Sequence, residues 1–126
     1  MNSIVHFEIP VDNPKRAENF YGKAFGWMMN HMDELDYTMV GTTETSEEGM
    51  PKEAGAINGG MPKRGGPVKH TVVTISVEDI DASLKKIQEL GGKTVQPKTS
   101  IGDMGFTAYF EDTEGNVVGL WAPAKM

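Results

Sequence analysis

The chain of 126 residues contains no cysteine. Disulfide bonds, thiolate metal ligands and a cysteine nucleophile are therefore excluded, and we expect a reducing, cytoplasmic location. The chain also lacks an apolar run of the roughly 20 residues that a membrane-spanning helix needs. Its first residues do not show the basic-then-apolar pattern of a signal peptide. These absences predict a globular protein that does not depend on a membrane.

Basic charge is also scarce. The formal net charge is −6, and basic residues occur in runs of no more than two. Nucleic acids and anionic membranes attract basic surfaces, so neither is an expected partner. The glycine pairs are not followed by the Gly-Lys-Ser/Thr of a phosphate loop, and no serine has the context of a nucleophile elbow. The composition otherwise predicts one folded domain spanning residues 1–126.

The chain does contain a repeated pattern. A strand-like run at 5–12 precedes a helix-like stretch that ends at Phe25-Gly26, and a similar run at 71–78 precedes a stretch that ends at Gly91-Gly92. The two copies are offset by 66 residues. This offset predicts two modules, about 1–61 and 68–126, joined by a Pro/Gly-rich linker at 62–67. Two packed copies are expected to enclose a cleft, where small molecules usually bind.

Residue periodicity predicts one core face for each strand and helix. In the strand at 4–11, alternation directs His6 and Glu8 to the face opposite the core. The predicted core residues of the first module are Val5, Phe7, Ile9 and Val11 on this strand, and Ala17, Phe20, Tyr21 and Ala24 on a helix that starts at 12–14 and stops at Gly26. Those of the second module are Val73, Ile75 and Val77 on the strand, and Ile80, Leu84, Ile87 and Leu90 on a helix capped by Asp79 or Asp81.

Further strands are predicted at 37–40, 56–61, 93–95, 107–111 and 117–121, with a tight turn at 112–116. The acidic segment 43–55 is predicted to be a solvated, mobile loop. Trp27 is predicted to be a core residue, and Met28, Met29 and Met32 to fill gaps beneath the helices. Together these elements predict an α+β fold, with two tandem βαβββ modules forming a cupped, mostly antiparallel sheet and the helices on its outer face.

The ordered set of motifs resembles the vicinal oxygen chelate superfamily, also called the glyoxalase, bleomycin-resistance and extradiol-dioxygenase superfamily. The matching segments are His6–Val11 with Phe20-Tyr21 and Phe25-Gly26-Trp27, then 77–82 with 90–93, and finally 112–121. The resemblance covers nearly the whole chain. It implies paired βαβββ modules that form an open, cupped sheet, often completed across a homodimer.

In metal-using members, as the resemblance implies, four ligands come from the first and last strands of the two modules. His6 occupies the first-strand position of module one, whereas Val72 occupies that of module two. Gly119 occupies the last-strand position of module two. Asn58 and Glu53 are the alternatives for module one. Since valine and glycine cannot ligate, no cofactor is the preferred expectation. A divalent metal at an improvised site of His6, Glu8 and His70 is the alternative.

Small-molecule binding is the preferred function. Trp121 shares a strand face with Gly119 and is expected to form the base of a pocket for a flat or apolar ligand. The other residues expected to line this pocket are His6, Glu8, His70, Val72 and either Phe106 or Tyr109. The acidic charge suits a cationic ligand, and the resemblance implies a homodimer. Glu8 is the candidate general base if the protein is an enzyme. A divalent-metal lyase or dioxygenase, and a structural or regulatory protein without a pocket, are the competing hypotheses, because this fold hosts several chemistries.

Overall fold

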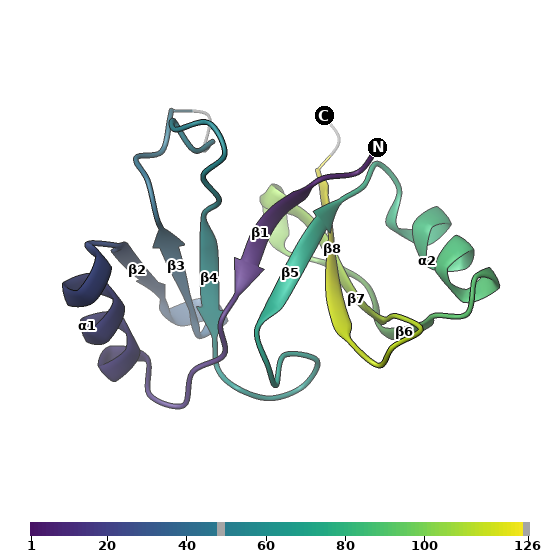
Figure 1. Ribbon diagram of the computed structural model, residues 1–126, viewed down its shortest axis with the longest axis horizontal. Coiled ribbons are helices and arrows are strands. Elements are labelled where there is room, and N and C mark those ends of the chain that lie inside the picture. The colour runs from purple at the N-terminus through teal and green to yellow at the C-terminus, as the bar shows by residue number, and fades with distance from the viewer. Residues whose placement is uncertain (48–49, 125–126) are drawn as a thin grey trace. The chain divides into compact units, whose positions relative to one another are not determined.

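The computed structural model describes residues 1–47 and 50–124. The chain divides into two compact units. We call His6–Thr71 the first unit, and Met1–Val5 with Val72–Met126 the second unit. Across the described residues, two α-helices and eight strands form an α+β fold with a mixed open sheet, as predicted (Figure 1).

Apart from the start of the first strand, each unit contains one helix and the strands of one module. The elements of module one are β1 (Ile4–Glu8), α1 (Pro14–Phe25), β2 (Met28–Met32), the short 3-10 helix η1 (Asp33–Leu35), β3 (Tyr37–Gly41) and β4 (Gly59–Pro62). Those of module two are β5 (Val72–Ser76), α2 (Ile80–Glu89), β6 (Lys93–Ser100), the 3-10 helix η2 (Gly102–Met104), β7 (Gly105–Glu111) and β8 (Val117–Pro123). Strand β1 begins in the second unit and continues into the first.

The two modules share one topology. The strand order is β1-β4-β3-β2 in module one and β5-β8-β7-β6 in module two. In each, the first strand pairs with the last in parallel, and the other neighbours pair antiparallel. This repetition confirms the tandem βαβββ plan and its mostly antiparallel character.

The 66-residue offset between the two modules also relates the N-cap residues of their helices. The side chain of Asn13 accepts a hydrogen bond from the Arg16 amide at 3.1 Å, and that of Asp79 accepts one from the Ala82 amide at 3.0 Å. Such side chains satisfy amides that have no partner inside the helix. Gly26 then ends α1 with a left-handed backbone at φ 73°, a conformation that glycine adopts without strain.

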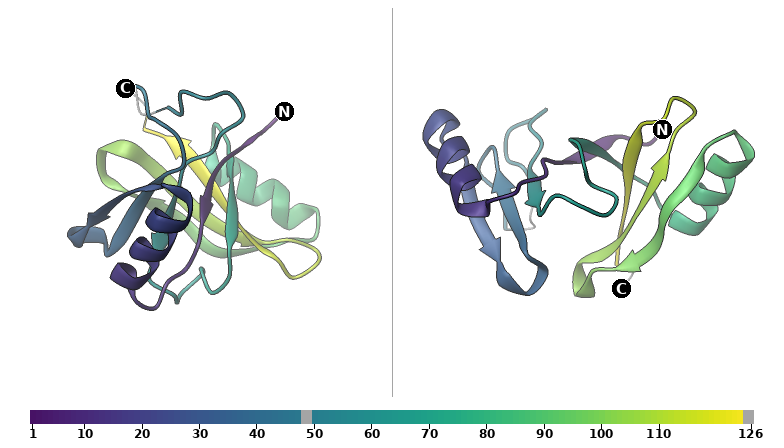
Figure 2. Two further views of the ribbon diagram at one scale, coloured as in Figure 1. Left: turned by 60° about the vertical axis from the view of Figure 1, so that its left-hand side comes forward. Right: turned by 90° about the horizontal axis from the view of Figure 1, so that it is seen from below.

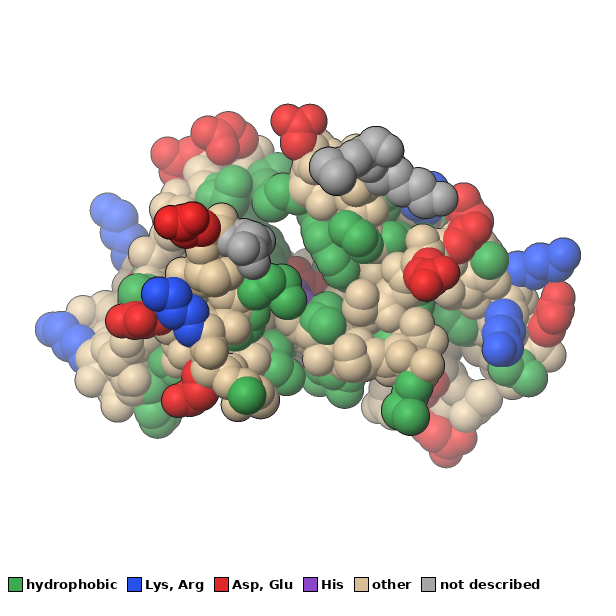
Figure 3. Space-filling model, turned by 90° about the horizontal axis from the view of Figure 1, so that it is seen from above, with side chains coloured by type: hydrophobic (Ala, Val, Ile, Leu, Met, Phe, Trp, Pro, Cys, Tyr) green, Lys and Arg blue, Asp and Glu red, His purple; other side chains and the backbone are tan. Residues whose placement is uncertain are grey.

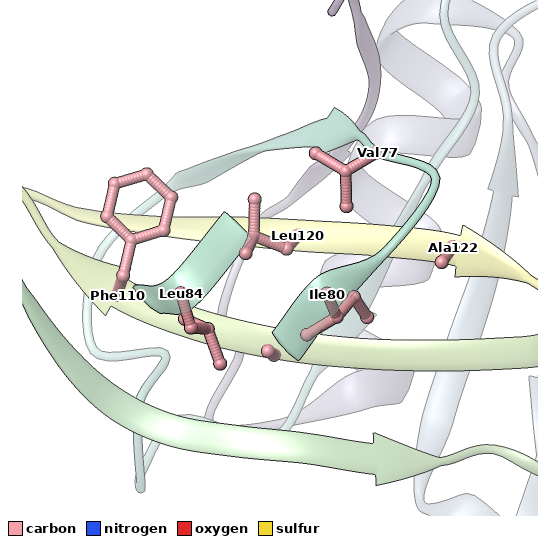
Figure 4. Close-up of a cluster of buried hydrophobic side chains, with 7 residues drawn as sticks. Val77, Ile80, Leu84, Phe110, Leu120 and Ala122 are labelled. Carbon is pink, nitrogen blue, oxygen red and sulfur yellow. The ribbon is translucent and has the colours of Figure 1, made fainter. Parts of the chain in front are cut away.

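The second unit has an apolar core between α2 and its sheet. In Figure 4, side chains from α2, from β7 and β8 and from the end of β5 converge on one cluster. Its buried members are Val77, Ile80, Leu84, Ala108, Phe110, Leu120 and Ala122, with Ile75, Ile87, Phe106 and Val118 packed against them. Figure 2 shows α2 lying against the strands of its unit. The prediction for Leu90 is wrong, since it is 70% exposed because α2 ends one residue earlier.

The core of the first unit is smaller. Val11, Val40 and Met61 are buried, and Phe7, Ile9, Ala17, Tyr21, Trp27 and Met29 pack against them, which confirms Trp27 as a core residue. Helix α1 buries none of its residues completely. The predictions for Phe20 and Ala24 are wrong, because Phe20 is 59% exposed and Ala24 is also exposed.

A polar network explains much of this difference. Glu18 lies at the position of Leu84 by the 66-residue offset, and strand register matches Thr38 with Ala108. Fully buried Thr38 donates a hydrogen bond to Glu18 Oε2 at 2.7 Å, and its oxygen lies 3.0 Å from His31 Nδ1. Module one therefore holds a hydrogen-bonded acid, hydroxyl and imidazole where module two packs methyl groups.

Several element boundaries differ from the predictions. Strand β2 was predicted only as gap-filling methionines, and Met28 is exposed rather than beneath a helix. Strand β1 ends at Glu8 because Pro10 lacks an amide hydrogen, although Ile9 still donates to the Gly60 carbonyl at 3.0 Å. The predictions of Val5 and Val73 as core residues are also wrong, because both side chains are about 40% exposed. In the acidic loop, Thr45 bridges Pro51, and residues 48 and 49 lie outside the described residues.

Candidate functional site

His6 and Tyr37 form a pair on the face of the first unit that points away from α1. His6 Nε2 lies 2.9 Å from the Tyr37 hydroxyl. Gly60, on the strand between them, makes the pair possible, because a Cβ there would overlap the Tyr37 ring and hydroxyl. The tyrosine ring thus lies directly over the Gly60 backbone. The first-strand imidazole is consequently engaged by a side chain of its own module.

Burial lowers the pKa of His6, because a charged imidazolium loses its hydration there. The ring is therefore neutral at pH 7, with one nitrogen that donates and one that accepts. A neutral imidazole is suited to a polar contact with a ligand as well as to metal ligation. Its chemistry alone does not choose between the two roles.

Glu8 shares this strand face with His6 and pairs with Gly60 in the sheet. It is only 6% exposed. His70 is exposed and lies just before β5. Within residues 1–47 and 50–124, no group of three or more His, Cys, Asp or Glu side chains is arranged to hold a metal ion. The described structure thus gives no support for an improvised metal site of His6, Glu8 and His70, which stays a prediction.

Strand register identifies the last-strand position that the sequence left open. Glu8 pairs with Gly60 as Thr74 pairs with Gly119, so Gly60 is the counterpart of Gly119. A Cβ on Gly119 would lie 2.8 Å from Thr74 Oγ1. Neither earlier alternative occupies this position. Asn58 instead accepts a hydrogen bond from the Thr42 amide at 2.9 Å, and Glu53 lies in the loop before β4.

A divalent metal therefore does not fit the side chains at these four positions. Val72, Gly60 and Gly119 offer no ligand atom, and only His6 does. Protein sites for divalent metals gather several imidazoles or oxygens around the ion. One imidazole that already contacts a tyrosine hydroxyl is too few donors for such a site.

The second unit brings four predicted residues onto one sheet face, opposite α2. Val72 lies on β5, Gly119 and Trp121 on β8, and Tyr109 on β7 directly across from Gly119. Val72 is 2% exposed, whereas Tyr109 and Trp121 are partly exposed. A Cβ on Gly105 would lie 2.9 Å from Cη2 of Trp121, so the indole extends across the start of β7. The face therefore carries a partly exposed indole close to Gly105.

The choice between Phe106 and Tyr109 is resolved by strand alternation. Phe106 points to the opposite face and packs against the core of the second unit. The Lys98 ammonium lies 4.4 Å from the centroid of its ring. Phe106 is therefore a structural residue in this unit. Tyr109 is the aromatic residue on the face that carries Trp121.

Sequence reasoning missed Tyr37 and Gly60 as part of these faces, and it did not include Thr74 among the candidate ligand-binding residues, although alternation put Thr74 on the face opposite the core. The 66-residue offset would have matched Thr74 with Glu8. It fails for Gly60, because the long segment between β3 and β4 shifts the spacing of module one. Tyr37 had no signal beyond its place in a predicted strand. Pairing across the sheet is what connects it to His6.

A family model described as bleomycin resistance protein-like N-terminal matches residues 3–43. CFP32 of Mycobacterium tuberculosis, whose name assigns it provisionally to the glyoxylases, is 28% identical over 125 residues. The match covers 90% of this chain and 43% of CFP32. The chain thus spans less than half the length of this curated relative.

Two solved structures show the same fold. Streptomyces coelicolor methylmalonyl-CoA epimerase, in complex with 2-nitronate-propionyl-CoA, aligns with a TM-score of 0.67 at 17% identity, covering 98% of this chain and 96% of the epimerase. A glyoxalase/bleomycin resistance protein/dioxygenase superfamily member from Vibrio splendidus 12B01 aligns with a TM-score of 0.61 at 10% identity, covering 98% and 100%. The family-model match, the curated relative and the shared fold of these structures all support the resemblance to the vicinal oxygen chelate superfamily that the motifs predict.

On the face drawn in Figure 3, acidic and basic side chains are scattered and do not form a continuous basic patch. No helix among the described residues is both long enough and apolar enough to cross a membrane.

Proposed function

We propose that this protein binds a flat, apolar or cationic small molecule on the helix-free sheet faces, without a metal ion. One observation carries the proposal. Both last-strand positions that would supply a chelating side chain are glycines, and Tyr37 and Thr74 lie against them. The faces keep groups suited to recognition, because Trp121 offers a partly exposed indole and His6 a neutral imidazole.

The ligand class follows from the second unit's face. An indole face attracts flat rings and cations, and a protein of net charge −6 favours the approach of a cation. Polar selectivity would come from Tyr109 and Thr74, which lie on the same face. We further propose that the protein acts in the cytoplasm as a homodimer.

The alternative function is a divalent-metal lyase or dioxygenase of the same superfamily. Glu8 favours it, since a carboxylate that is 6% exposed beside His6 on one strand face is a reasonable general base. The solved structures that resemble this chain include a methylmalonyl-CoA epimerase in complex with 2-nitronate-propionyl-CoA. This alternative needs a metal, and three of the four expected ligand positions have none to offer.

Metal analysis and ligand binding distinguish the two functions. Purified protein is analysed for bound metals and screened for thermal stabilisation by Ni²⁺, Zn²⁺, Mn²⁺ and Fe²⁺. The proposal expects substoichiometric metal and no stabilisation that depends on His6. Stoichiometric metal that is lost in His6→Ala would overturn it and support the enzyme.

The binding arm uses N-methylquinolinium as a flat cation and 2-naphthoate as an anion of similar shape. We expect N-methylquinolinium to bind the wild type, with affinity reduced about tenfold in Trp121→Ala and less in Trp121→Phe, because the indole supplies the stacking and cation–π contact. Equal binding by wild type and Trp121→Ala would contradict the proposed site.

A further inference from the structure

A hollow of about 390 Å³ lies on the helix side of the first unit, formed by the end of β1, the following turn, α1 and Arg64. It is lined by Ile9, Val11, Ala17, Phe20 and Tyr21 as well as by polar groups. The hollow is broadly open to solvent, and its volume is within the range of small-molecule sites. The hollow lies on the opposite side of the sheet from His6 and Glu8, so it is separate from the faces discussed above.

The hollow exists because α1 covers its sheet less completely than α2 does. No residue of α1 is fully buried, whereas α2 buries Ile80 and Leu84. Phe20 lines the hollow while 59% exposed, and Arg16 lies one helical turn before it on the same side of α1. Module two carries Ala82 and Lys86 at these positions. An arginine followed one turn later by an exposed phenylalanine is specific to module one.

The charged groups at the hollow leave an excess of positive charge. Arg64 is fixed by hydrogen bonds from Nε to Asp12 Oδ1 at 3.0 Å, from Nη1 to the Lys69 carbonyl at 2.9 Å and from Nη2 to the Pro10 carbonyl at 3.4 Å. Two of its five N–H groups stay available. Within the described part of the chain, the Arg16 guanidinium makes no hydrogen bond or ion pair. Asp12 is the one carboxylate among the lining residues.

We propose that this hollow binds a small carboxylate that carries an aryl or alkyl group. The guanidinium of Arg16, with the remaining N–H groups of Arg64, would hold the carboxylate, because guanidinium groups match carboxylate geometry and stay charged. The apolar part would pack on Phe20 and Tyr21. The proposal does not rest on the function proposed for the helix-free faces, and it concerns a ligand of opposite charge.

The test is a titration with 4-phenylbutyrate, followed by amide NMR shifts and by tryptophan fluorescence. Tyr21 stacks on Trp27 with ring centroids 5.1 Å apart and planes at 6°, so a ligand on Tyr21 should alter Trp27 emission. We expect shifts confined to residues 9–21 and 64. Affinity should fall about tenfold in Arg16→Ala, because a charge-assisted hydrogen bond is lost.

Matched variants control for charge and for aromatic surface. Lys15→Ala removes a neighbouring exposed charge, and Phe25→Ala removes an aromatic residue that is 63% exposed but does not line the hollow. Both should bind 4-phenylbutyrate like the wild type, whereas Phe20→Ala should bind more weakly. Trp121→Ala should also bind normally, which separates this site from the proposed cation site.

Neutral 4-phenylbutan-1-ol and cationic 4-phenylbutylamine serve as ligand controls, and both should bind at least about tenfold more weakly than the carboxylate. Equal binding of the three compounds would overturn the proposal, since it would show that the guanidinium groups do not recognise charge. Absence of binding, shifts centred elsewhere, or equal effects of Arg16→Ala and Lys15→Ala would also overturn it.

Discussion

Thr38 is the centre of the polar network in the first unit, and Thr38→Val removes its hydroxyl while conserving its shape. The hydroxyl donates to Glu18 Oε2 at 2.7 Å and lies 3.0 Å from His31 Nδ1. Thr38 itself is 0% exposed. The substitution therefore leaves a carboxylate and an imidazole without their shared partner.

The expected cost follows from how far those two groups can recover hydration. A hydrogen bond to a charged group contributes about 1.5–3 kcal/mol when its loss leaves the charge buried. The side chains of His31 and Glu18 are 30% and 22% exposed, so water can replace part of the lost contact. We therefore expect Thr38→Val to lower the free energy of unfolding by about 1–2 kcal/mol.

The double variant Glu18→Leu/Thr38→Ala gives the sharper test, because it copies the matched pair Leu84 and Ala108 of module two. Removing both partners leaves neither an unpaired acid nor an unpaired hydroxyl, and apolar replacement of a buried polar pair is often close to neutral. The double variant should cost less than the sum of its single variants, with a coupling energy of about 1 kcal/mol.

Urea denaturation of each variant at pH 7 measures these differences, provided that the slope with urea is unchanged. Thr71→Val is the control, since Thr71 is exposed and its substitution should stay within about 0.5 kcal/mol of the wild type. A Thr38→Val cost no larger than this control, or strict additivity in the double variant, would refute the role assigned to the network.

Three further predictions concern backbone, burial and pH. Gly105→Ala should lower the free energy of unfolding by about 1–3 kcal/mol, because its Cβ would overlap the Ala122 carbonyl. Gly102→Ala, at φ 70° with open space around it, should lower it by about 1 kcal/mol in the same denaturation assay. Leu84→Ala should cost about 2–5 kcal/mol because it opens a cavity in the core, and Leu90→Ala, at a 70% exposed position, should cost less than about 0.5 kcal/mol; equal costs would contradict the core assignment. Because burial lowers the pKa of His6, the unfolded chain binds the proton more readily, so stability should fall as pH drops through the ordinary imidazole range near 6.5 and level off below the folded pKa. His6→Gln should flatten this dependence in unfolding measured between about pH 7.5 and 5, and an unchanged pH profile would show that His6 is not its source.

The repeated plan could be predicted from the sequence because its signals are local. Strand alternation and helix caps depend on residues a few positions apart, and the caps at Asn13 and Asp79 keep the 66-residue offset in the structure. The central part of the core of module two was also predictable, since Leu84 and Ile87 follow helical spacing and pack as expected.

What could not be predicted depends on pairing across the sheet. The short strand Met28–Met32 carries Asn30 and His31 among three methionines, so it lacks an alternating pattern. Phe20 has the spacing of a core residue, but the core beneath α1 is small and is partly replaced by the Glu18–Thr38–His31 network. The link between His6 and Tyr37 joins residues 31 positions apart. No local pattern reports such a contact.

Placing a metal ligand at Gly60 or Gly119 would require a further change in the same module, because each glycine lies against another side chain. A metal-ligating side chain in place of Gly60 would overlap Tyr37, which contacts His6. Tyr37 would therefore have to be replaced in the same variant. A side chain at Gly119 would press on Thr74, and Val72 would also have to change in that module. In each unit, a neighbouring side chain therefore occupies the space that a metal-ligating side chain would need. Such packing favours a face that recognises its ligand by shape, stacking and neutral hydrogen bonds.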